Sequence, residues 1–410
     1  MKETNDIHCS FCGRSKDEVK LLIAGEEGHI CENCVGHAQE IIEQELMHTA
    51  SGPSKELSFK MMKPTEIKKF LDEYVIGQDE AKKILAVAVY NHYKRLQQKV
   101  QDDVEIEKSN VIMVGETGTG KTLLARSIAR LLQVPFAIVD ATVFTEAGYV
   151  GEDVESILSR LLQVCNYDVA AAERGIVYID EIDKVARKQD NPSITRDVSG
   201  EGVQQAMLKL LEGTEVLVPP QGGRKHPEQK MVKVNTRDIL FICGGAFDGI
   251  DKIIARRVQT NAIGFTVNKD SQEYTRKHIL QYVNAQDLRG FGLIPELLGR
   301  LPVVTYLNSL DHDALKAILT EPRNALMKQY KKLFEMEGIR LKIEKDAIEY
   351  IISKAMEYKL GARGLRSICE AIMTDAMFNM PSSNEKEFVL NVNYAQKQME
   401  KSTMARLKVA

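Results

Sequence analysis

Residues 111–132 read VIMVGETGTGKTLLARSIARLL, and this stretch decides the fold of the chain. Its first four residues are apolar and mostly β-branched, as in a short buried strand. The glycine-rich motif GETGTGKT follows at 115–122, and apolar residues then recur at helical spacing as far as Leu131. A strand, a glycine-rich loop and a helix in this order are typical of a site that binds nucleotide phosphates. We therefore predict an α/β domain built around a phosphate-binding loop.

Each residue type in this loop has a chemical role. Glycines let backbone N–H groups converge on phosphate oxygens, Lys121 reaches the β- and γ-phosphates, and the Thr122 hydroxyl coordinates Mg²⁺. The alternative, a glycine-rich turn with a purely structural role, does not account for the flanking strand and helix. The predicted nucleotide-binding residues are Gly115, Glu116, Thr117, Gly118, Thr119, Gly120, Lys121, Thr122 and Leu123.

A second apolar run, GIVYIDEIDK at 175–184, leads into two adjacent carboxylates. A buried parallel strand has this composition, and open α/β sheets bind ligands at the C-terminal ends of their strands. We expect Asp180 to hold Mg²⁺ together with Thr122, and Glu181 to polarise the attacking water. A surface acidic cluster is the alternative. With the phosphate-binding loop, these residues predict a domain that hydrolyses ATP.

The composition limits the class of protein. The chain has 410 residues, of which 44% are hydrophobic and 28% charged, and its formal net charge is -3. This length predicts two or three domains. No apolar run approaches the roughly 20 residues of a membrane helix, and the start MKETNDIHCS lacks the apolar core of a signal peptide. We expect a cytoplasmic protein with neither a membrane nor a nucleic acid as its partner.

Four of the seven cysteines lie near the start, in two C-x-x-C pairs separated by residues 13–30. Cys9, Cys12, Cys31 and Cys34 have the spacing of a zinc ribbon, and four thiolates around Zn²⁺ make a closed, structural site. Two disulfides are the alternative, which a reducing cytosol disfavours. The metal would supply the folding energy that so short a segment lacks. The nearby histidines that could replace one cysteine are His8, His29 and His37.

The chain divides into four segments. Residues 1–48 form the zinc-binding domain, and its run IIEQELM at 41–47 predicts a short amphipathic helix. Residues 49–63, TASGPSKELSFKMMK, have the composition of a linker. The large ATPase domain covers 64–308. Residues 309–410 form a small α/β domain, in which strands such as IRLKI and FVLNV alternate with helices such as DAIEYIISKAM.

Several motifs in the same order resemble one known family. They are GETGTGKT, YIDEID, PELLGRLP and GARGLRS. Together they resemble the AAA+ ATPases, and with the zinc ribbon nearly the whole chain resembles the ClpX family of bacterial protein-unfolding subunits. The resemblance implies an AAA+ P-loop large domain, a small α/β lid domain and a zinc-ribbon-like domain in front of them.

The resemblance also implies a function. Members form a homohexameric ring, with ATP held between the large and small domains and the neighbouring subunit. They unfold tagged proteins, delivered directly or by adaptors, and feed them through the central pore to the peptidase ClpP. A ClpP-like peptidase, tagged or unfolded substrates and adaptors are therefore the expected partners of this chain.

The resemblance carries roles to matching residues outside the phosphate-binding loop. Val75 and Ile76 in YVIGQ would line the adenine pocket, although as bare sequence they could equally be core residues. Arg300 in LLGRLP would be the arginine finger that reaches the neighbour's γ-phosphate; a surface cation is the alternative. Arg363 in GARGLRS would contact the nucleotide from the small domain, with Arg366 as a less favoured alternate.

The chain departs from the family pattern at two places. Glu116 stands where the family usually has proline, which puts the rigidity of the loop in question. After the strand DILFIC, the sequence continues GGAF, without the Asn or Thr that many AAA+ proteins use to sense the γ-phosphate. No residue is assigned to that role.

Two loops are candidates for contact with a substrate chain. Tyr149 and Val150 lie between two glycines, after a predicted strand PFAIVDAT and before a helix predicted to begin near Glu152. The resemblance makes them a pore loop; a turn that packs on the core is the alternative. The second loop, VPPQGGRKHPEQK, would ring the pore entrance with cations, or form a solvated charged turn. Its three candidate residues are Arg224, Lys225 and His226.

The segment 249–290 is predicted to interrupt the ATPase core with charged sequence that lacks periodicity. It contains NAIGFTV at 261–267, in which Ile263 and Phe265 flank Gly264. Two large apolar side chains in a polar loop suit a peg for a partner's pocket. In the resembling family, an Ile-Gly-Phe loop at this place docks the ring onto the peptidase.

Two other classes of function compete with a protein unfoldase. A nucleic-acid motor or remodelling ATPase predicts a basic face with interleaved aromatic residues, which the sequence does not contain. A non-enzymatic scaffold predicts a degraded ATPase site, whereas Lys121, Asp180, Glu181 and Arg300 are all in place.

Overall fold

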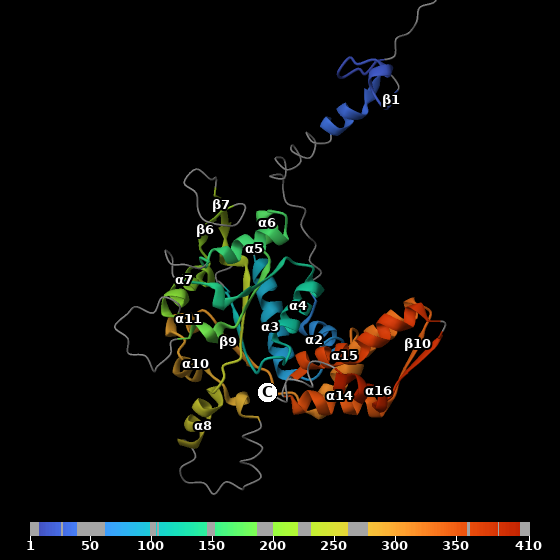
Figure 1. The fold of residues 1–410 in the computed structure, drawn as a ribbon. Coiled ribbons are helices and arrows are strands. Elements are labelled where there is room, and N and C mark those ends of the chain that lie inside the picture. Colours follow the sequence, from blue (N-terminus) through green and yellow to red (C-terminus); the bar gives the residue numbers. More distant parts are fainter. Residues whose placement is uncertain are drawn as a thin grey trace, which may run out of the picture. The chain divides into compact units, whose positions relative to one another are not determined.

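The computed structural model describes residues 8–25, 28–38, 62–98, 104, 106–145, 152–186, 200–219, 231–260, 278–358, 361–383 and 385–401. The chain forms two compact units, Met1–Lys60 and Met61–Ala410. Figure 1 shows the ribbon of both units. No helix within the described residues is long and apolar enough to span a membrane.

The first unit is small and contains little secondary structure. Strands β1 (Leu22–Ala24) and β2 (His29–Cys31) pair antiparallel, a 3₁₀ helix spans Lys16–Glu18, and a helix covers 32–38. Among the described residues of this unit, the buried apolar positions are Cys9 and Cys31. The unit therefore folds around its thiols and not around an apolar core. The predicted helix at 41–47 lies outside the described residues.

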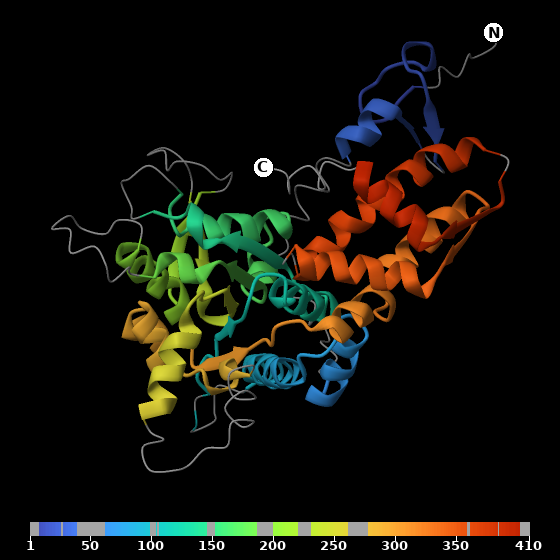
Figure 2. The ribbon, with the colours of Figure 1, turned by 60° about the horizontal axis from the view of Figure 1, so that its bottom comes forward.

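The large domain of the second unit is built on a five-stranded parallel sheet with the order β4-β5-β8-β3-β9. All four residues of β3 are buried, so helices cover both faces of the sheet (Figures 1 and 2). This confirms the predicted α/β architecture of the large domain. The strands are β3 (Val111–Val114), β4 (Phe136–Asp140), β5 (Ile176–Asp180), β8 (Leu240–Gly245) and β9 (Val303–Tyr306).

The helices and hairpin of the large domain complete these layers. The antiparallel hairpin consists of β6 (Glu215–Val218) and β7 (Val232–Asn235). The α-helices are α2 (Pro64–Asp72), α3 (Asp79–Leu96), α4 (Lys121–Leu132), α5 (Ser156–Val164), α6 (Val169–Ala172), α7 (Glu201–Glu212), α8 (Ile250–Thr260), α10 (Ala285–Phe291) and α11 (Pro295–Gly299). The 3₁₀ helices are Ala141–Val143, Ile182–Val185, Thr236–Asp238 and Ile279–Tyr282.

Two sequence predictions about this domain are wrong in part. The segment 249–290 was expected to lack periodicity, but its two ends are the helices α8 and α10. Ile250 and Ile254 of α8 are buried, one helical turn apart, between charged residues that hide this narrow apolar stripe. Helix α5 begins at Ser156, after a turn, and not near Glu152.

The small domain has its own apolar core and agrees with the predicted alternation of helices and strands. Strands β10 (Arg340–Ile343) and β11 (Glu387–Leu390) pair in parallel. The core joins residues of every α-helix in this domain. These helices are α12 (His312–Thr320), α13 (Leu326–Met336), α14 (Lys345–Glu357), α15 (Gly361–Asn379) and α16 (Val392–Lys401), and a 3₁₀ helix spans Met380–Ser382.

Gln204 in α7 joins three segments inside the large domain. Its side chain is fully buried, and its Nε2 donates to the carbonyl oxygens of Val185, at 2.8 Å, and Gly292, at 3.2 Å. Its Oε1 accepts from the backbone N–H of Ile294 at 2.8 Å. The amide thus satisfies the backbone after β5 and at the turn between α10 and α11.

We predict that Gln204→Met lowers the free energy of unfolding of the large domain by about 3 kcal/mol, because buried backbone groups lose their partner. Calorimetry of the full chain measures this as a lower transition temperature. The matched control is Gln163→Met on the exposed side of α5, with an expected change within about 0.5 kcal/mol. Equal stability of the two variants would contradict the assigned role of Gln204.

Candidate functional site

The loop between β3 and α4 has backbone conformations that require glycine. Gly118 and Gly120 have φ values of +88° and +106°, in the left-handed region that L side chains rarely adopt. At Gly115, a Cβ would lie 2.9 Å from both Cβ and the carbonyl oxygen of Leu307. The loop thus curls tightly ahead of the first turn of α4, as the sequence predicted.

Lys121 lies inside this loop. Its side-chain nitrogen donates to the carbonyl oxygen of Glu116 at 2.9 Å and also to that of Gly115. Burial lowers the pKa of Lys121, while the charges of Asp180 and Asp183 oppose the shift. A buried cation at the N-terminus of α4 is suited to a polyanion such as the phosphates of ATP.

Glu116, which stands where the family usually has proline, contacts the loop through its backbone. Its side chain is exposed, and its carbonyl oxygen accepts from the Thr119 hydroxyl at 2.8 Å as well as from Lys121. A proline at this position would present the same carbonyl oxygen, so neither hydrogen bond depends on the side chain of Glu116. Glu116 therefore contributes its backbone to the site, and its carboxylate extends into solvent.

Asp180 at the end of β5 meets Thr122 at the start of α4. The Thr122 hydroxyl donates to Oδ2 of Asp180 at 3.1 Å. Oδ1 accepts from the Tyr178 hydroxyl at 3.2 Å and from the backbone N–H of Glu181 at 3.0 Å. Hydroxyl and carboxylate oxygens are the hard ligands that Mg²⁺ takes, so these residues fit the ion.

Glu181 follows directly in a strained conformation. Its φ is 55°, in the left-handed region that is uncommon for a residue other than glycine. Its side chain is exposed, one residue beyond the strand end that carries Asp180. The backbone thus turns sharply at the edge of the sheet where the sequence predicted the water-activating carboxylate.

The first turn of α15, in the small domain, lies against the phosphate-binding loop. A Cβ on Gly118 would lie 3.6 Å from the backbone nitrogen of Ala362 and 3.8 Å from that of Arg363. The positive charge of Arg363 also contributes to the lowered pKa of Lys121. Arg366 instead donates to Oε1 of Gln329 at 3.5 Å. Of the two candidate arginines, the structure therefore places Arg363 at the loop.

The segment between α2 and α3 contacts the loop from another direction. Val75 is 5% exposed, and its Cγ1 would lie 3.9 Å from a Cβ on Gly120. Ile76 beside it is half-buried. Val75 is thus both a core residue and a neighbour of the phosphate-binding loop, so the two alternatives from the sequence are compatible.

Gln78 is a residue that the sequence reasoning missed. Its Nε2 donates to the carbonyl oxygen of Asn308 at 2.9 Å, and its Oε1 accepts from the Asn308 N–H at 2.8 Å. Its backbone is left-handed, with a φ of 58°. The Gln78 amide thus bonds both backbone groups of Asn308, at the point where the chain leaves β9 toward the small domain. Gly77 before it predicts a turn, but nothing in the local sequence indicates that Gln78 bonds to Asn308.

Arg300 lies away from Lys121 of its own chain. Its carbonyl oxygen accepts from Nδ2 of Asn110 at 2.9 Å, and its guanidinium pairs with Glu212 at 3.0 Å. Asn110 precedes β3, whereas the phosphate-binding loop follows it. Four residues of strand, at about 3.3 Å each, separate the two ends. Arg300 is therefore about 13 Å, the length of this strand, from the phosphate-binding loop of its own chain.

The candidate pore and docking residues lie outside the described part of the chain. They are Tyr149, Val150, Arg224, Lys225, His226, Ile263, Gly264 and Phe265. The ends of two of these loops are described. Phe144 pairs with Glu152, and Val218 pairs with Val232. Each of these loops therefore leaves and rejoins the domain at neighbouring positions.

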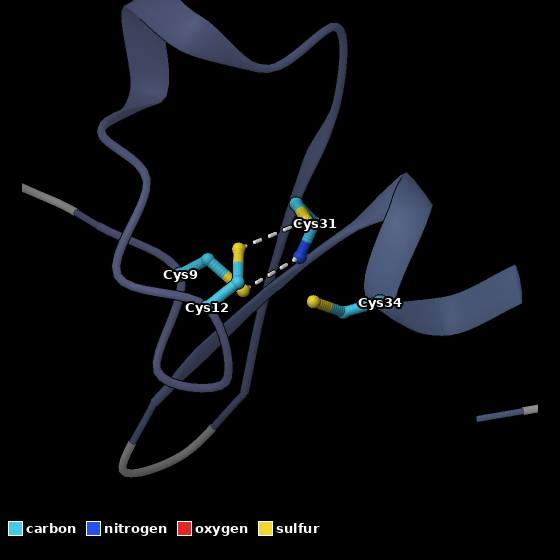
Figure 3. A group of neighbouring side chains, drawn as sticks. All are labelled: Cys9, Cys12, Cys31 and Cys34. Atoms are coloured by element: carbon cyan, nitrogen blue, oxygen red, sulfur yellow. Dashed lines mark hydrogen bonds between the residues drawn. The ribbon is translucent and has the colours of Figure 1, made fainter. Parts of the chain in front are cut away.

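In the first unit, the four predicted cysteines converge (Figure 3). The sulfur atoms of Cys9, Cys12, Cys31 and Cys34 all lie within 4.8 Å of one another, and all four thiols are free. Among the described residues, the group contains no histidine, so the alternative that a histidine replaces one cysteine is not supported. The geometry fits a tetrahedral Zn²⁺ site with four sulfur ligands.

The thiols differ in how readily they ionise. Burial disfavours the charged form of Cys9, but backbone hydrogen bonds, from Cys12 and Cys31 among others, outweigh this effect and lower its pKa to about 6. The hydrogen bond with the Cys12 thiol raises the pKa of Cys34 to about 12. Zn²⁺ binds cysteine as the thiolate, so metal binding at this site would be coupled to the release of thiol protons.

We predict that removing zinc with a chelator unfolds residues 8–38 but leaves ATP hydrolysis of the full chain within about twofold, because the two units are separate. Amide hydrogen exchange of 8–38 and ATPase rates measure the two effects.

Cys34→Ser should lower zinc content. The control, Cys165→Ser, removes a half-buried thiol outside the cluster and should retain zinc. Protection of 8–38 without zinc would contradict the prediction.

Comparison with known proteins gives three family matches. Residues 7–44 match the model of the ClpX C4-type zinc finger, residues 106–304 that of the AAA domain (Cdc48 subfamily), and residues 310–392 that of the C-terminal, D2-small domain of ClpB protein. These matches agree with the α/β core, the cysteine cluster and the small domain described above.

Curated relatives match over nearly the full length. A protein of Bacteroides thetaiotaomicron is 64% identical over 405 residues, 98% of each chain. A protein of Bacteroides fragilis is 63% identical over 412 residues, covering 100% of this chain and 99% of its own. One of Porphyromonas gingivalis is 60% identical over 397 residues, 96% of this chain and 97% of its own. Each is named ATP-dependent Clp protease ATP-binding subunit ClpX.

Proposed function

The chain belongs to the ClpX family of AAA+ ATPases, and from this premise we propose that it is an ATP-dependent protein unfoldase and translocase. Its enzymatic activity is ATP hydrolysis, and its cofactors are ATP with Mg²⁺ and a structural Zn²⁺. The relatives are named as subunits of a protease. We extend the proposal accordingly to a ClpP-like peptidase that receives the unfolded chain.

The observation that carries the proposal is the composite nature of the ATP site. Thr122 and Asp180 of the large domain meet at 3.1 Å, and the first turn of α15 from the small domain lies against the same loop. Arg300 lies near the N-terminal end of β3, at the opposite end of the strand from the phosphate-binding loop of its own chain. ATP bound here contacts two domains and a neighbouring subunit, so hydrolysis changes how they pack. A motor needs this coupling.

The residues of one chain divide the chemical work. The backbone N–H groups of Gly115–Lys121 and the Lys121 ammonium bind the phosphates, and Val75 and Ile76 hold the adenine. Held by Thr122 and Asp180, Mg²⁺ would neutralise charge on the β- and γ-phosphates. Glu181 orients the attacking water and accepts its proton.

A ring of six identical chains completes each site. Arg300 of a neighbour contacts the γ-phosphate, where a planar guanidinium stabilises charge that develops in the transition state. Arg363 contacts the same nucleotide from the small domain. We assign the large domain to 64–308 and the small domain to 309–410, so that the segment after β9 is the hinge between them.

The loops outside the described residues would act on the substrate and the peptidase. Tyr149 and Val150 grip an unfolded chain by side-chain bulk, and Arg224, Lys225 and His226 select tags at the pore entrance. Ile263, Gly264 and Phe265 dock onto the peptidase. The zinc-binding domain, 1–48, recruits substrates or adaptors at the end of the linker 49–63.

We predict that Glu181→Gln lowers the rate of ATP hydrolysis at least about 100-fold, because the general base is lost. The affinity for ATP stays within about twofold, since the phosphates are bound by other groups. Steady-state hydrolysis and equilibrium binding of a fluorescent ATP analogue measure the two effects. The control, Glu337→Gln, changes an exposed carboxylate in the small domain and should hydrolyse ATP normally. Rapid turnover by the Glu181 variant would rule out the assigned role.

We further predict ATP-dependent loss of signal from a stable fluorescent protein with an unstructured degradation tag, when a trap captures the unfolded product.

Tyr149→Ala should retain ATP hydrolysis and lose unfolding, because the grip on the substrate is lost. Deletion of 263–265 should retain unfolding but lose degradation by an added ClpP-like peptidase. Brisk ATP hydrolysis by an assembled ring without unfolding of any tagged substrate would refute the proposal.

A further inference from the structure

The C-terminal end of β8 bears two glycines, and the structure shows what occupies the space beside them. A Cβ on Gly244 would lie 2.1 Å from the hydroxyl oxygen of Tyr178. A Cβ on Gly245 would lie 2.7 Å from Oδ1 of Asp183 and 2.6 Å from the Phe247 ring. Real Cβ atoms do not approach other atoms this closely. The glycines therefore make room for side chains of the neighbouring strand β5 and of the turn that follows it.

Tyr178 reaches this space from inside β5. Its side chain is fully buried. Because residues two apart in a strand point to the same face, its phenol lies on the same side of the sheet as Asp180. The single proton of the hydroxyl is donated to Oδ1 of Asp180 at 3.2 Å. Because residue 244 is glycine, no side chain of β8 competes with the phenol for this space.

The hydroxyl completes a set of three donors around one carboxylate. Oδ2 of Asp180 accepts from Thr122, and Oδ1 accepts from Tyr178 and from the Glu181 N–H. With both oxygens held, the carboxylate has one orientation relative to the Thr122 hydroxyl. Outer partners of this kind orient the groups that hold a metal, and their loss typically weakens metal binding by 10- to 100-fold.

Asp183 fixes the adjoining residue of β8 in a similar way. Its side chain is buried, and its Oδ1 accepts from the backbone N–H of Ala246 at 3.0 Å. Gly245 in turn accepts from the backbone N–H of Gly115 in the phosphate-binding loop, at 3.2 Å. The end of β8 is thus bonded to the turn after β5 through the Asp183 side chain, and to the phosphate-binding loop through a backbone hydrogen bond.

We propose that Tyr178 is a positioning residue of the ATP site, whose hydroxyl orients Asp180 toward Mg²⁺ from the space that a side chain at position 244 would fill. This inference rests on the proposed assignment of Thr122 and Asp180 to the metal. The inference also gives Gly244 a function, because the absence of a side chain there leaves space for the Tyr178 hydroxyl from the neighbouring strand β5.

The test is Tyr178→Phe, which removes one oxygen and keeps the ring. Mn²⁺ replaces Mg²⁺ as the probe, and the full chain is saturated with a non-hydrolysable ATP analogue. The electron paramagnetic resonance signal of free Mn²⁺ reports binding without turnover. The dissociation constant for Mn²⁺ should rise about tenfold. Binding of the analogue in EDTA should stay within twofold, because the phosphate contacts are unchanged.

Tyr93→Phe is the matched control. Tyr93 is also buried, and its hydroxyl donates to the carbonyl oxygen of Arg174 at 3.1 Å, outside the ATP site. This variant loses a buried hydroxyl bond and should bind Mn²⁺ normally. A second variant, Gly244→Ala, keeps the phenol but pushes it away from Asp180, and should also weaken Mn²⁺ binding.

Asp180→Asn separates failure of this inference from failure of the proposed function. Weakened Mn²⁺ binding in the variants of Tyr178, Gly244 and Asp180, but not of Tyr93, supports the inference. Normal binding by Tyr178→Phe, with weakened binding by Asp180→Asn, overturns it and leaves the metal site in place. Normal binding by Asp180→Asn overturns the metal assignment, and the inference with it. Equal weakening by the Tyr93 variant would assign the effect to stability alone.

Discussion

The hydrogen bond between Thr122 and Asp180 is the constraint on which the ATP site depends. It joins α4 to the end of β5, although β8 lies between β3 and β5 in the sheet. Parallel alignment brings the C-terminal ends of these strands to one edge, so the phosphate-binding loop and the carboxylates meet there. Burial of β3 on both faces fixes this register. The loop predicted to bind phosphate and the strand end that carries the predicted catalytic carboxylates therefore have one relative position.

The same edge extends to the small domain through the chain that leaves β9. Leu307 packs against Gly115, Gln78 clasps the backbone of Asn308, and Arg323 pairs with Glu73 at 3.1 Å. These contacts join the hinge to the segment that carries Val75 and to the phosphate-binding loop. In the proposed function, a change in nucleotide would act on both sides of this hinge. Arg300 lies near the opposite end of β3, where its carbonyl oxygen accepts from Asn110; a neighbouring subunit would supply this arginine in the proposed ring.

Local patterns predicted most of the fold and part of the site. Strands β3, β5 and β8 are apolar runs, and the cysteine spacing names the metal ligands without help from the fold. Helix α8 was missed because charged residues surround a narrow apolar stripe. Gln78 was missed because its partner, Asn308, is distant in sequence. Tyr178 was missed because the residue that leaves space for its hydroxyl, Gly244, lies on another strand. In the sequence, Gly244 only marks the absence of a polar side chain after the strand DILFIC. In the structure, it leaves space for the hydroxyl of Tyr178 from β5. The roles of Arg300, Arg363 and the loops outside the described residues stay predictions.

The measurement that tests this account most directly is the change in distance between the large and small domains on binding ATP. Fluorophores on unnatural amino acids at the exposed positions Val164 and Met356 report it by energy transfer, in rings that contain one labelled chain. In a Glu181→Gln background, the account predicts a shift in transfer efficiency when ATP binds, and loss of that shift with Arg363→Ala. Tight ATP binding with no shift would contradict the claim that the nucleotide drives the hinge.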